Sequence, residues 1–419
     1  MKYNNLFKYV IITFLAFLFT QMIFAKTPKV KLGVEILAES NFEILKDKRV
    51  GLITNASGVD SKLNSTIDIL NAGKGFKLVA LFGPEHGIRG DVEGGDNISD
   101  YIDKSTGIPV YSLYGKNRKP SPEVLENIDV LVYDIQDIGC RSYTFISSLG
   151  KIMEAAAEAN KEVIVLDRPN PLGGEKVEGN IVEDGYFSFI SQFPIPYVYA
   201  LTVGELANML NNEGMLENNA KCKLTVVKMD GWKRNYSFED TGLNWVPTSP
   251  HVPHKDSPAF YVMSGIVGEL RDVISIGVGY TLPFQTFAYK GVDGIELAKR
   301  LNNLQLPGIL FMPISYKPYY AFGKDEQITG VEVFITDFNK IELMKTQLYV
   351  LQELSQMYPD YNIFEKSKAN HIRAFDKAMG TDQIRSIFSK NFKVSDVESY
   401  LNKDIEPFKL LSKKYYLYN

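Results

Sequence analysis

The residues best suited to chemistry lie in one glycine-rich stretch, which reads KLVALFGPEHGIRGDVEGG from Lys77 to Gly95. Its apolar first part, Leu78 to Phe82, predicts a buried strand that stops at a Gly-Pro pair. Glu85 follows directly, and a carboxyl group partly shielded from water has the raised pKa that a general acid needs. Glu85 is therefore a candidate catalytic acid or base. The alternative is a loop carboxylate that pairs with Arg89 or caps a helix.

Three further acids stand at or just after the ends of other predicted strands. Asp134 and Asp137 follow one of these strands, and Asp167 ends the next. Any of them can be the second carboxylate of a glycoside hydrolase, or can hold substrate hydroxyls. The alternative, which is commoner for a single Asp, is to accept hydrogen bonds from loop amides.

Basic side chains near these acids suggest how a ligand would be held. Arg89, Arg141 and Arg168 offer planar pairs of donors that suit a ligand carboxylate, although internal ion pairs with the same acids are the alternative. His86 is better suited to hydrogen bonding with Glu85 or substrate than to metal binding. With four histidines in the chain and no tight His/Asp cluster, no metal is expected.

The elements that must position these residues alternate between strand and helix. Short strands rich in Val, Ile and Leu are predicted at 49–54, 77–82, 129–134 and 162–167, with helices at 61–70 and 145–159. This pattern predicts a parallel sheet covered on both faces, Rossmann-like in class, and without a G-x-G-x-x-G motif it implies no dinucleotide. Parallel strands end at one edge. The loops there should bring together Asn55, Glu85, His86, Asp134, Asp137, Arg141, Asp167, Arg168 and Asn170.

The rest of the chain predicts a second, smaller α+β unit. We place the first domain at 26–248 and the second at 249–419, which would close the cleft. The first contains a helix at 203–212 that begins in a capping box, followed by a further strand at 224–229, and the second contains a strand at 329–336 and a helix at 341–357. The aromatic stretch 187–199 is predicted to be a loop that lines a groove.

Composition and the amino terminus limit the function classes. Lysines precede a long apolar run within residues 1–25, which predicts a cleaved secretory signal peptide and an exported protein; an uncleaved anchor is the alternative. The mature part should have no membrane span. The net charge of −4 and the lack of a basic block argue against nucleic acid or anionic lipid as a partner. The two cysteines, Cys140 and Cys222, are not expected to pair.

Four motifs resemble one known family along the whole mature chain. They are ITNASG at 53–58, FGPEHGIRG at 82–90, YDIQDIGCRSYT at 133–144 and LDRPNPLGG at 166–174. Their order and spacing are similar to those of the DUF1343 family, described as the NamZ-type exo-β-N-acetylmuramidases. Two segments differ from the family's usual pattern: SPHVP at 249–253, where S-P-N-I-P is common, and SIGVGY at 275–280.

This resemblance implies a glycoside hydrolase that releases β-linked N-acetylmuramic acid from the non-reducing end of peptidoglycan fragments, in cell-wall turnover and without a cofactor. It implies that Glu85 is the catalytic residue. A non-catalytic sugar-binding protein of the envelope, using the same cleft, is the alternative. We predict Glu85, His86, Asp134 and Asp137 as the catalytic group, and Asn55, Arg89, Gln136, Arg141, Tyr143, Asp167, Arg168, Asn170 and His251 as substrate-binding residues.

Overall fold

A seven-stranded sheet forms the centre of the first domain in the computed structural model, which describes residues 30–90, 100–115 and 118–419. The predicted signal peptide lies outside the described residues. All strand pairs of this sheet are parallel except that of β3 with β4. The strand order is β3 (Tyr101–Ile102), β4 (Pro109–Ser112), β2 (Lys77–Gly83), β1 (Arg49–Thr54), β5 (Val130–Asp134), β6 (Glu162–Leu166) and β9 (Lys223–Val227).

Helices cover both faces of this sheet, because successive side chains of each strand point to opposite sides. In β5, Val130 and Val132 pack with α2 (Gly33–Glu39) and α3 (Thr66–Ala72). Leu131 and Tyr133 pack on the other face with α5 (Phe145–Glu158) and α6 (Val203–Asn212). The predicted parallel α/β sheet is therefore confirmed, and the four predicted strands agree with β1, β2, β5 and β6 to within a residue at each end.

Two local predictions in this domain were wrong. The helix predicted at 61–70 begins only at Thr66, because Ser65 caps it and Leu63 is an exposed residue with φ 68°. The stretch 187–199 does not line a groove along its length. Its second half enters the core, where Tyr197 and Tyr199 are buried and β8 (Val198–Tyr199) pairs with β7 (Val177–Glu178).

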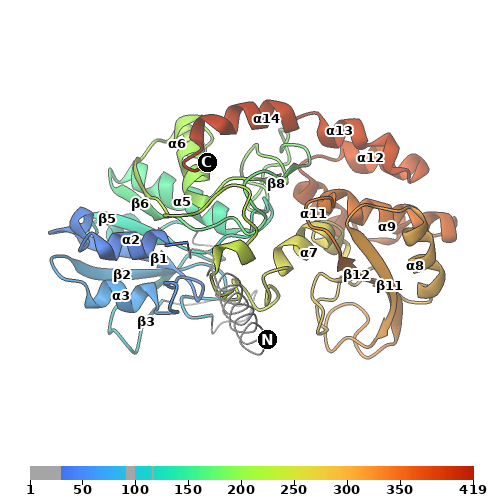
Figure 1. Cartoon of the computed structure of the whole chain (residues 1–419), viewed down its shortest axis with the longest axis horizontal. Helices are drawn as coiled ribbons and strands as arrows, with labels where there is room; N and C mark the ends of the chain where they lie inside the picture. The colour runs from blue at the N-terminus through green and yellow to red at the C-terminus, as the bar shows by residue number, and fades with distance from the viewer. Residues whose placement is uncertain (1–29, 91–99, 116–117) are drawn as a thin grey trace, which may run out of the picture.

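The second domain contains a three-stranded antiparallel sheet in the order β10 (Thr286–Tyr289), β12 (Ile328–Ile335), β11 (Ile309–Tyr316). The helices α8 (Gly294–Asn303) and α9 (Leu343–Met357) pack beside it, as Figure 1 shows. The smaller α+β domain is thus confirmed, although β10 and β11 were not predicted. Among the described residues, further α-helices are α4 (Pro122–Leu125) in the first domain and α7 (Ser257–Ser264), α10 (Ile363–Lys366), α11 (Ala369–Met379), α12 (Gln383–Asn391) and α13 (Glu398–Asn402) later in the chain.

The carboxyl terminus returns to the first domain. After α14 (Ile405–Ser412), which lies above both domains in Figure 1, the chain ends beside α6. The Tyr418 hydroxyl donates to the Asp167 carboxylate at 2.6 Å and accepts from the Met229 amide at 2.9 Å. The guanidinium of Arg234 stacks at 3.4 Å on Tyr416. The last residues therefore fasten the second half of the chain to the edge of the large sheet.

We expect Tyr418→Phe to lower the free energy of unfolding by about 1–3 kcal/mol, because it removes one donor from a buried carboxylate and one acceptor from a backbone amide. Urea unfolding at pH 7 measures this. Tyr349→Phe, which removes a half-buried hydroxyl from α9, is the matched control. Equal midpoints for the two variants would contradict a fastening role for the tail.

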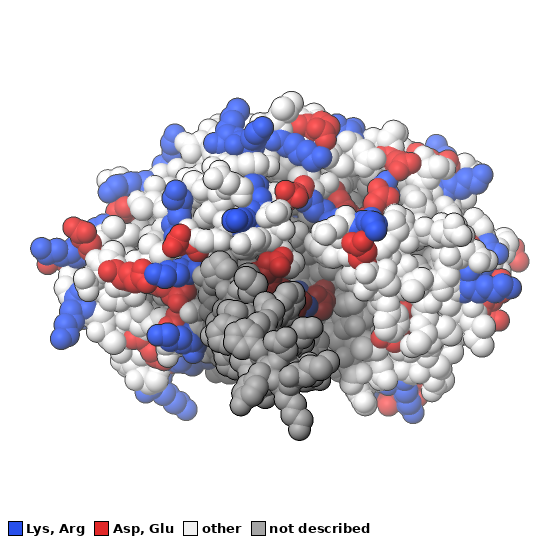
Figure 2. Space-filling model, viewed as in Figure 1, with Lys and Arg blue, Asp and Glu red and all other residues white. Residues whose placement is uncertain are grey.

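Two general properties complete the description. Both cysteines are buried free thiols. Across residues 30–90, 100–115 and 118–419, no helix combines the length and the apolar character that a membrane span requires. On the face seen in Figure 2, the described Lys and Arg side chains lie interspersed with Asp and Glu.

Candidate active site

Glu85 lies where it was predicted, directly after β2 at the carboxyl edge of the sheet. The backbone turns sharply here, because His86 and Gly87 both have positive φ values of 72° and 75°. Both Glu85 and His86 are half-buried. A non-glycine residue in the left-handed region is uncommon and marks a loop held in one conformation. The turn therefore presents the Glu85 carboxylate at a fixed place beside the sheet.

Two residues after β4 reach this carboxylate and its surroundings. The Tyr114 hydroxyl hydrogen-bonds to Glu85, and its pKa is raised by burial and by the Glu85 charge. Arg118 is close enough to lower the pKa of the same hydroxyl, and its guanidinium lies 4.0 Å over the Phe189 ring. The Tyr114 hydroxyl therefore lies near both the Glu85 carboxylate and the Arg118 guanidinium. Arg118 has no ion-pair partner among the described residues.

Tyr143 lies within electrostatic reach of both Glu85 and a second carboxylate. Burial raises the pKa of Tyr143, and the charges of both Asp137 and Glu85 raise it further. Its hydroxyl is 2.7 Å from the Thr248 Oγ1 atom, so its ring is fixed. The two acids that were predicted on separate loops therefore both lie near one aromatic ring.

Asp137 is the second carboxylate, and one of its oxygens is unused. Its Oδ2 atom accepts from the Gly139 amide at 2.8 Å and from the Tyr199 hydroxyl. Its Oδ1 atom is buried and has no hydrogen-bond partner among the described residues. Burial outweighs these hydrogen bonds and raises the pKa of Asp137 to about 6. An unpaired buried carboxylate oxygen costs stability, which is expected where it must hold a water molecule or a substrate group.

The second domain contributes one wall of the site. His251, in the segment before α7, has its Nε2 atom 2.6 Å from the Tyr320 hydroxyl on the loop between β11 and β12. Burial, followed by the charge of His86, lowers the pKa of His251. His86 and His251 are therefore neighbours. The predicted catalytic residue His86 and the predicted substrate-binding residue His251 therefore lie close together, at a place to which both domains contribute.

The predicted pair Asp134 and Arg168 forms a closed ion pair inside the fold. The Arg168 Nε and Nη2 atoms donate to the two carboxylate oxygens at 2.5 and 2.8 Å, and Thr66 also donates to Asp134. Asp134 is fully buried and Arg168 is 3% exposed. A buried pair with all its partners holds two loops in place. We therefore expect both residues to position the site rather than touch substrate.

Three predicted amide side chains are also used within the loops. Gln136 donates to the Asp137 and Pro169 carbonyls, Asn170 donates to Leu201, and Asn55 donates to Thr248. Gln136 and Arg168 do line a recess, but its volume is about 20 Å³. That is room for about one water molecule and not for a sugar ring. These amides fix the loops that carry Asp137 and Thr248.

Three other predicted binding residues face the protein itself. Asp167 accepts from Thr202, from the Gly204 amide and from Tyr418, and burial raises its pKa to about 6. The fully buried Arg141 guanidinium donates to four carbonyls, two of them in α11 of the second domain. Arg89 pairs with Asp103 at 2.9 Å. Each of these three residues therefore already has hydrogen-bond or ion-pair partners within the protein. Their contacts with substrate remain predictions.

Fewer of the predicted residues than expected lie together in the site, and residues that were not predicted also contribute to it. Glu85, His86, Asp137, Tyr143 and His251 are brought together, whereas the other predicted residues hold the loops around them. Arg118 and Tyr320 were missed because neither lies in a motif, and Tyr320 also comes from a loop far along the chain. No group of three or more potential metal-ligating side chains is found in the described part of the chain.

A carboxyl edge of a parallel sheet that holds two carboxylates near one aromatic ring, with a second domain beside it, defines a two-domain α/β protein suited to glycoside hydrolysis. Comparison with known families agrees. Residues 50–256 match the family model "Exo-beta-N-acetylmuramidase NamZ, N-terminal", and residues 259–418 match "Exo-beta-N-acetylmuramidase NamZ, C-terminal". The chain belongs to the NamZ family of exo-β-N-acetylmuramidases, which are glycoside hydrolases. The family resemblance predicted from the four motifs is confirmed.

Individual relatives support this membership. The chain is 41% identical over 394 residues to the peptidoglycan β-N-acetylmuramidase NamZ of Bacillus subtilis (strain 168), covering 94% of this chain and 92% of that protein. A DUF1343 family protein from Bacteroides fragilis NCTC 9343 has 56% identity and a TM-score of 0.89, over 93% of this chain and 99% of the other. A second one from that strain has 26% identity and a TM-score of 0.72 with the same coverage.

Proposed function

We propose that this protein hydrolyses the β-glycosidic bond of N-acetylmuramic acid at the non-reducing end of peptidoglycan fragments, including muropeptide-derived disaccharides. The observation that carries the proposal is that Glu85 and Asp137 both lie close enough to Tyr143 for their charges to raise its pKa. Glycoside hydrolysis needs two carboxyl groups, one to protonate the leaving oxygen and one to assist water or stabilise positive charge on the sugar. The family membership supplies the substrate class.

Each acid has one role in this proposal. Glu85, held by the Tyr114 hydroxyl, protonates the glycosidic oxygen as the bond to the sugar breaks. Asp137, whose pKa of about 6 leaves it ionised at pH 7, faces the developing positive charge and holds water through its unpaired Oδ1 atom. Water supplies the hydroxyl group of the released sugar, and its proton leaves to the carboxylate.

We propose Arg118 as the residue that recognises the lactyl carboxylate of muramic acid. The three arginines expected for this role are engaged elsewhere: Arg89 with Asp103, Arg141 with carbonyls and Arg168 with Asp134. Arg118 instead lies beside Tyr114, within electrostatic reach of the hydroxyl that contacts Glu85. A planar guanidinium held over an aromatic ring is well suited to bind a carboxylate in two places.

Arg118→Met should lower kcat/KM for a chromogenic N-acetylmuramic acid glycoside by about 10–100-fold, mainly through KM, because a charge-assisted pair is lost. The same variant should act unchanged on any residual N-acetylglucosaminide substrate, which lacks the lactyl group. Arg373→Met, in α11, is the control for removing an exposed arginine. An equal loss on both substrates would show that Arg118 does not read the carboxylate.

The assay that tests the function itself is release of free N-acetylmuramic acid from a disaccharide with that sugar at its non-reducing end. Binding of the disaccharide without product would favour a sugar-binding protein of the envelope instead. We also propose that the protein is exported, on the basis of the apolar run within residues 1–25. Fractionation of cells that express the full chain would test this, and an intact amino terminus in the cytoplasm would contradict it.

A further inference from the structure

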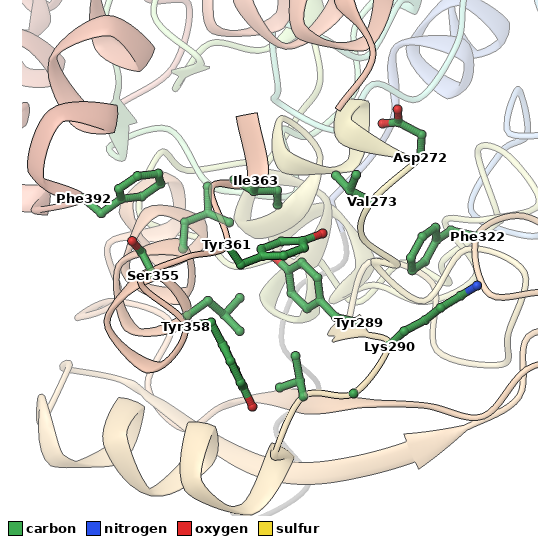
Figure 3. A pocket seen from close by; sticks show the side chains of 14 residues that line it. Asp272, Val273, Tyr289, Lys290, Phe322, Ser355, Tyr358, Tyr361, Ile363 and Phe392 are labelled. Atoms are coloured by element: carbon green, nitrogen blue, oxygen red, sulfur yellow. The ribbon is translucent and has the colours of Figure 1, made fainter. Parts of the chain in front are cut away.

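A second cavity lies within the second domain, apart from the Glu85 site. Its volume is about 360 Å³, and every lining residue lies between positions 272 and 392. It opens between the end of β10, the last turns of α9 and the segment around α10, as Figure 3 shows. A volume of this size is within the range of small-molecule sites. No residue of the proposed catalytic mechanism lines it.

The walls of this cavity are mainly apolar, with as many aromatic as aliphatic side chains. Five of the lining side chains are rings, and Figure 3 shows them around one space: Tyr289, Phe322, Tyr358, Tyr361 and Phe392. Aromatic faces pack against apolar faces of flat ligands, and tyrosines add hydroxyl groups at the edge. Sugar rings have this combination, because their C–H faces are apolar and their rims carry hydroxyls.

The charged groups at the cavity already have partners. Lys290 pairs with Glu326 at 2.7 Å, and the Asp272 carboxylate accepts from the Ser367 hydroxyl and the Lys368 amide. A charged ligand would therefore have to displace an existing interaction. The chemistry of the lining favours a ligand that is uncharged, partly apolar and able to hydrogen-bond.

One buried hydroxyl points to a missing partner. Tyr289, at the end of β10, is 5% exposed, and its hydroxyl has no hydrogen-bond partner among the described residues. Tyr361 lies next to it, close enough to raise the pKa of the Tyr289 hydroxyl after burial. Buried polar groups are nearly always hydrogen-bonded, and each exception needs an explanation. A ligand hydroxyl or carbonyl that displaces the side chains covering this hydroxyl would supply the partner.

We propose that this cavity is a non-catalytic binding site for one N-acetylated hexosamine ring, the sugar type at both ends of the bond that the proposed function cleaves. The choice of an N-acetylated sugar rests on that function, whereas the uncharged ring follows from the cavity. In this proposal the aromatic side chains pack on the ring and on the acetamido methyl group, and the lining residues Tyr289 and Ser355 supply hydroxyl groups for its polar rim.

The position of the cavity relates it to the active site through one loop. Phe322 lines the cavity, and Tyr320, two residues earlier on the loop between β11 and β12, contacts His251 in the active site. A sugar bound against Phe322 would therefore lie on the loop that forms one wall of the catalytic cleft. Such a site would hold another part of a glycan while its end is cleaved.

The test is binding of N-acetylglucosamine to the full chain, measured by calorimetry and by saturation-transfer NMR, with glucose as the sugar that lacks the acetamido group. We expect weak binding of N-acetylglucosamine and about tenfold weaker binding of glucose, from loss of the acetamido contacts. Tyr289→Phe should weaken binding about tenfold through one lost hydrogen bond, and Ser355→Trp should abolish it by filling the cavity. Tyr349→Phe on the same helix as Ser355 is the control.

Each other outcome overturns the proposal. Unchanged binding in Ser355→Trp would place the sugar in the catalytic cleft, and no binding at all, or binding of apolar compounds only, would make the cavity a packing defect. Tyr289→Phe should keep or raise the melting temperature, because it removes an unpaired hydroxyl, so lost binding cannot be ascribed to unfolding. Muramidase turnover is measured separately. Its absence, with cavity binding intact, would refute the proposed function and leave this site standing.

Discussion

Glu85→Gln should lower turnover of a disaccharide with N-acetylmuramic acid at its non-reducing end by about 10³-fold, because a positioned general acid contributes about 10²–10⁴-fold. The amide cannot give a proton to the leaving oxygen. It keeps the size of the side chain, and its oxygen still accepts the hydrogen bond from Tyr114. The fold should therefore survive, with an unchanged melting temperature and unchanged binding of the disaccharide.

The leaving group makes this test specific to acid catalysis. A nitrophenyl glycoside departs with little help from a proton, so Glu85→Gln should lose much less activity on it than on the disaccharide. Glu332→Gln, which changes a half-buried glutamate on β12, is the matched control and should behave as wild type on both. An equal loss on the two substrates would assign Glu85 to binding, and wild-type activity on both would remove it from the mechanism.

The strands could be predicted because their cause is local. Runs such as RVGLIT and DVLVYD are apolar at their four inner positions, as expected for a short strand covered on both faces, and the loops after them carry polar residues. The strand β11 was missed because it alternates: only Ile309, Phe311 and Tyr316 of its residues are buried, and Pro313 interrupts the pattern. Its pairing with β12 depends on contacts between two strands, which the sequence of β11 alone does not indicate.

The site was predictable only in outline, for a related reason. Sequence placed the charged loops at one edge, but could not say which charges would neutralise each other. Asp134 and Asp137 are three positions apart in one motif, yet Arg168 pairs with the first and leaves an oxygen of the second without a partner. That difference depends on the geometry of separate loops. The positions of Arg118 and Tyr320 depend on loop geometry even more, since each residue reaches the site from a segment without a motif.

The two buried aspartates with raised pKa values give the sharpest test of the mechanism. Asp137 and Asp167 each have a pKa of about 6, raised by burial. If Asp137 must be ionised, kcat/KM should fall about tenfold for each pH unit below 6, because only the ionised fraction acts. Asp137→Asn should lower the plateau at pH 7 by about 10²–10³-fold and remove this acid limb. Asp167→Asn, which changes a carboxyl of the same pKa that holds the tail, should keep the acid limb.

Stability should move in the opposite direction from activity in Asp137→Asn. The folded-state pKa of about 6 lies above the ordinary value of about 4, so the folded chain binds the proton more tightly than the unfolded chain. Ionisation of Asp137 therefore costs stability as the pH rises from 4 to 6, by up to about 3 kcal/mol. The neutral amide avoids this cost and still accepts from Gly139 and Tyr199. Urea unfolding at pH 7 should show a variant that is more stable and nearly inactive, the combination expected where a protein keeps a strained carboxylate for catalysis. A less stable variant with an intact acid limb would instead make Asp137 a structural residue and leave Glu85 without its partner.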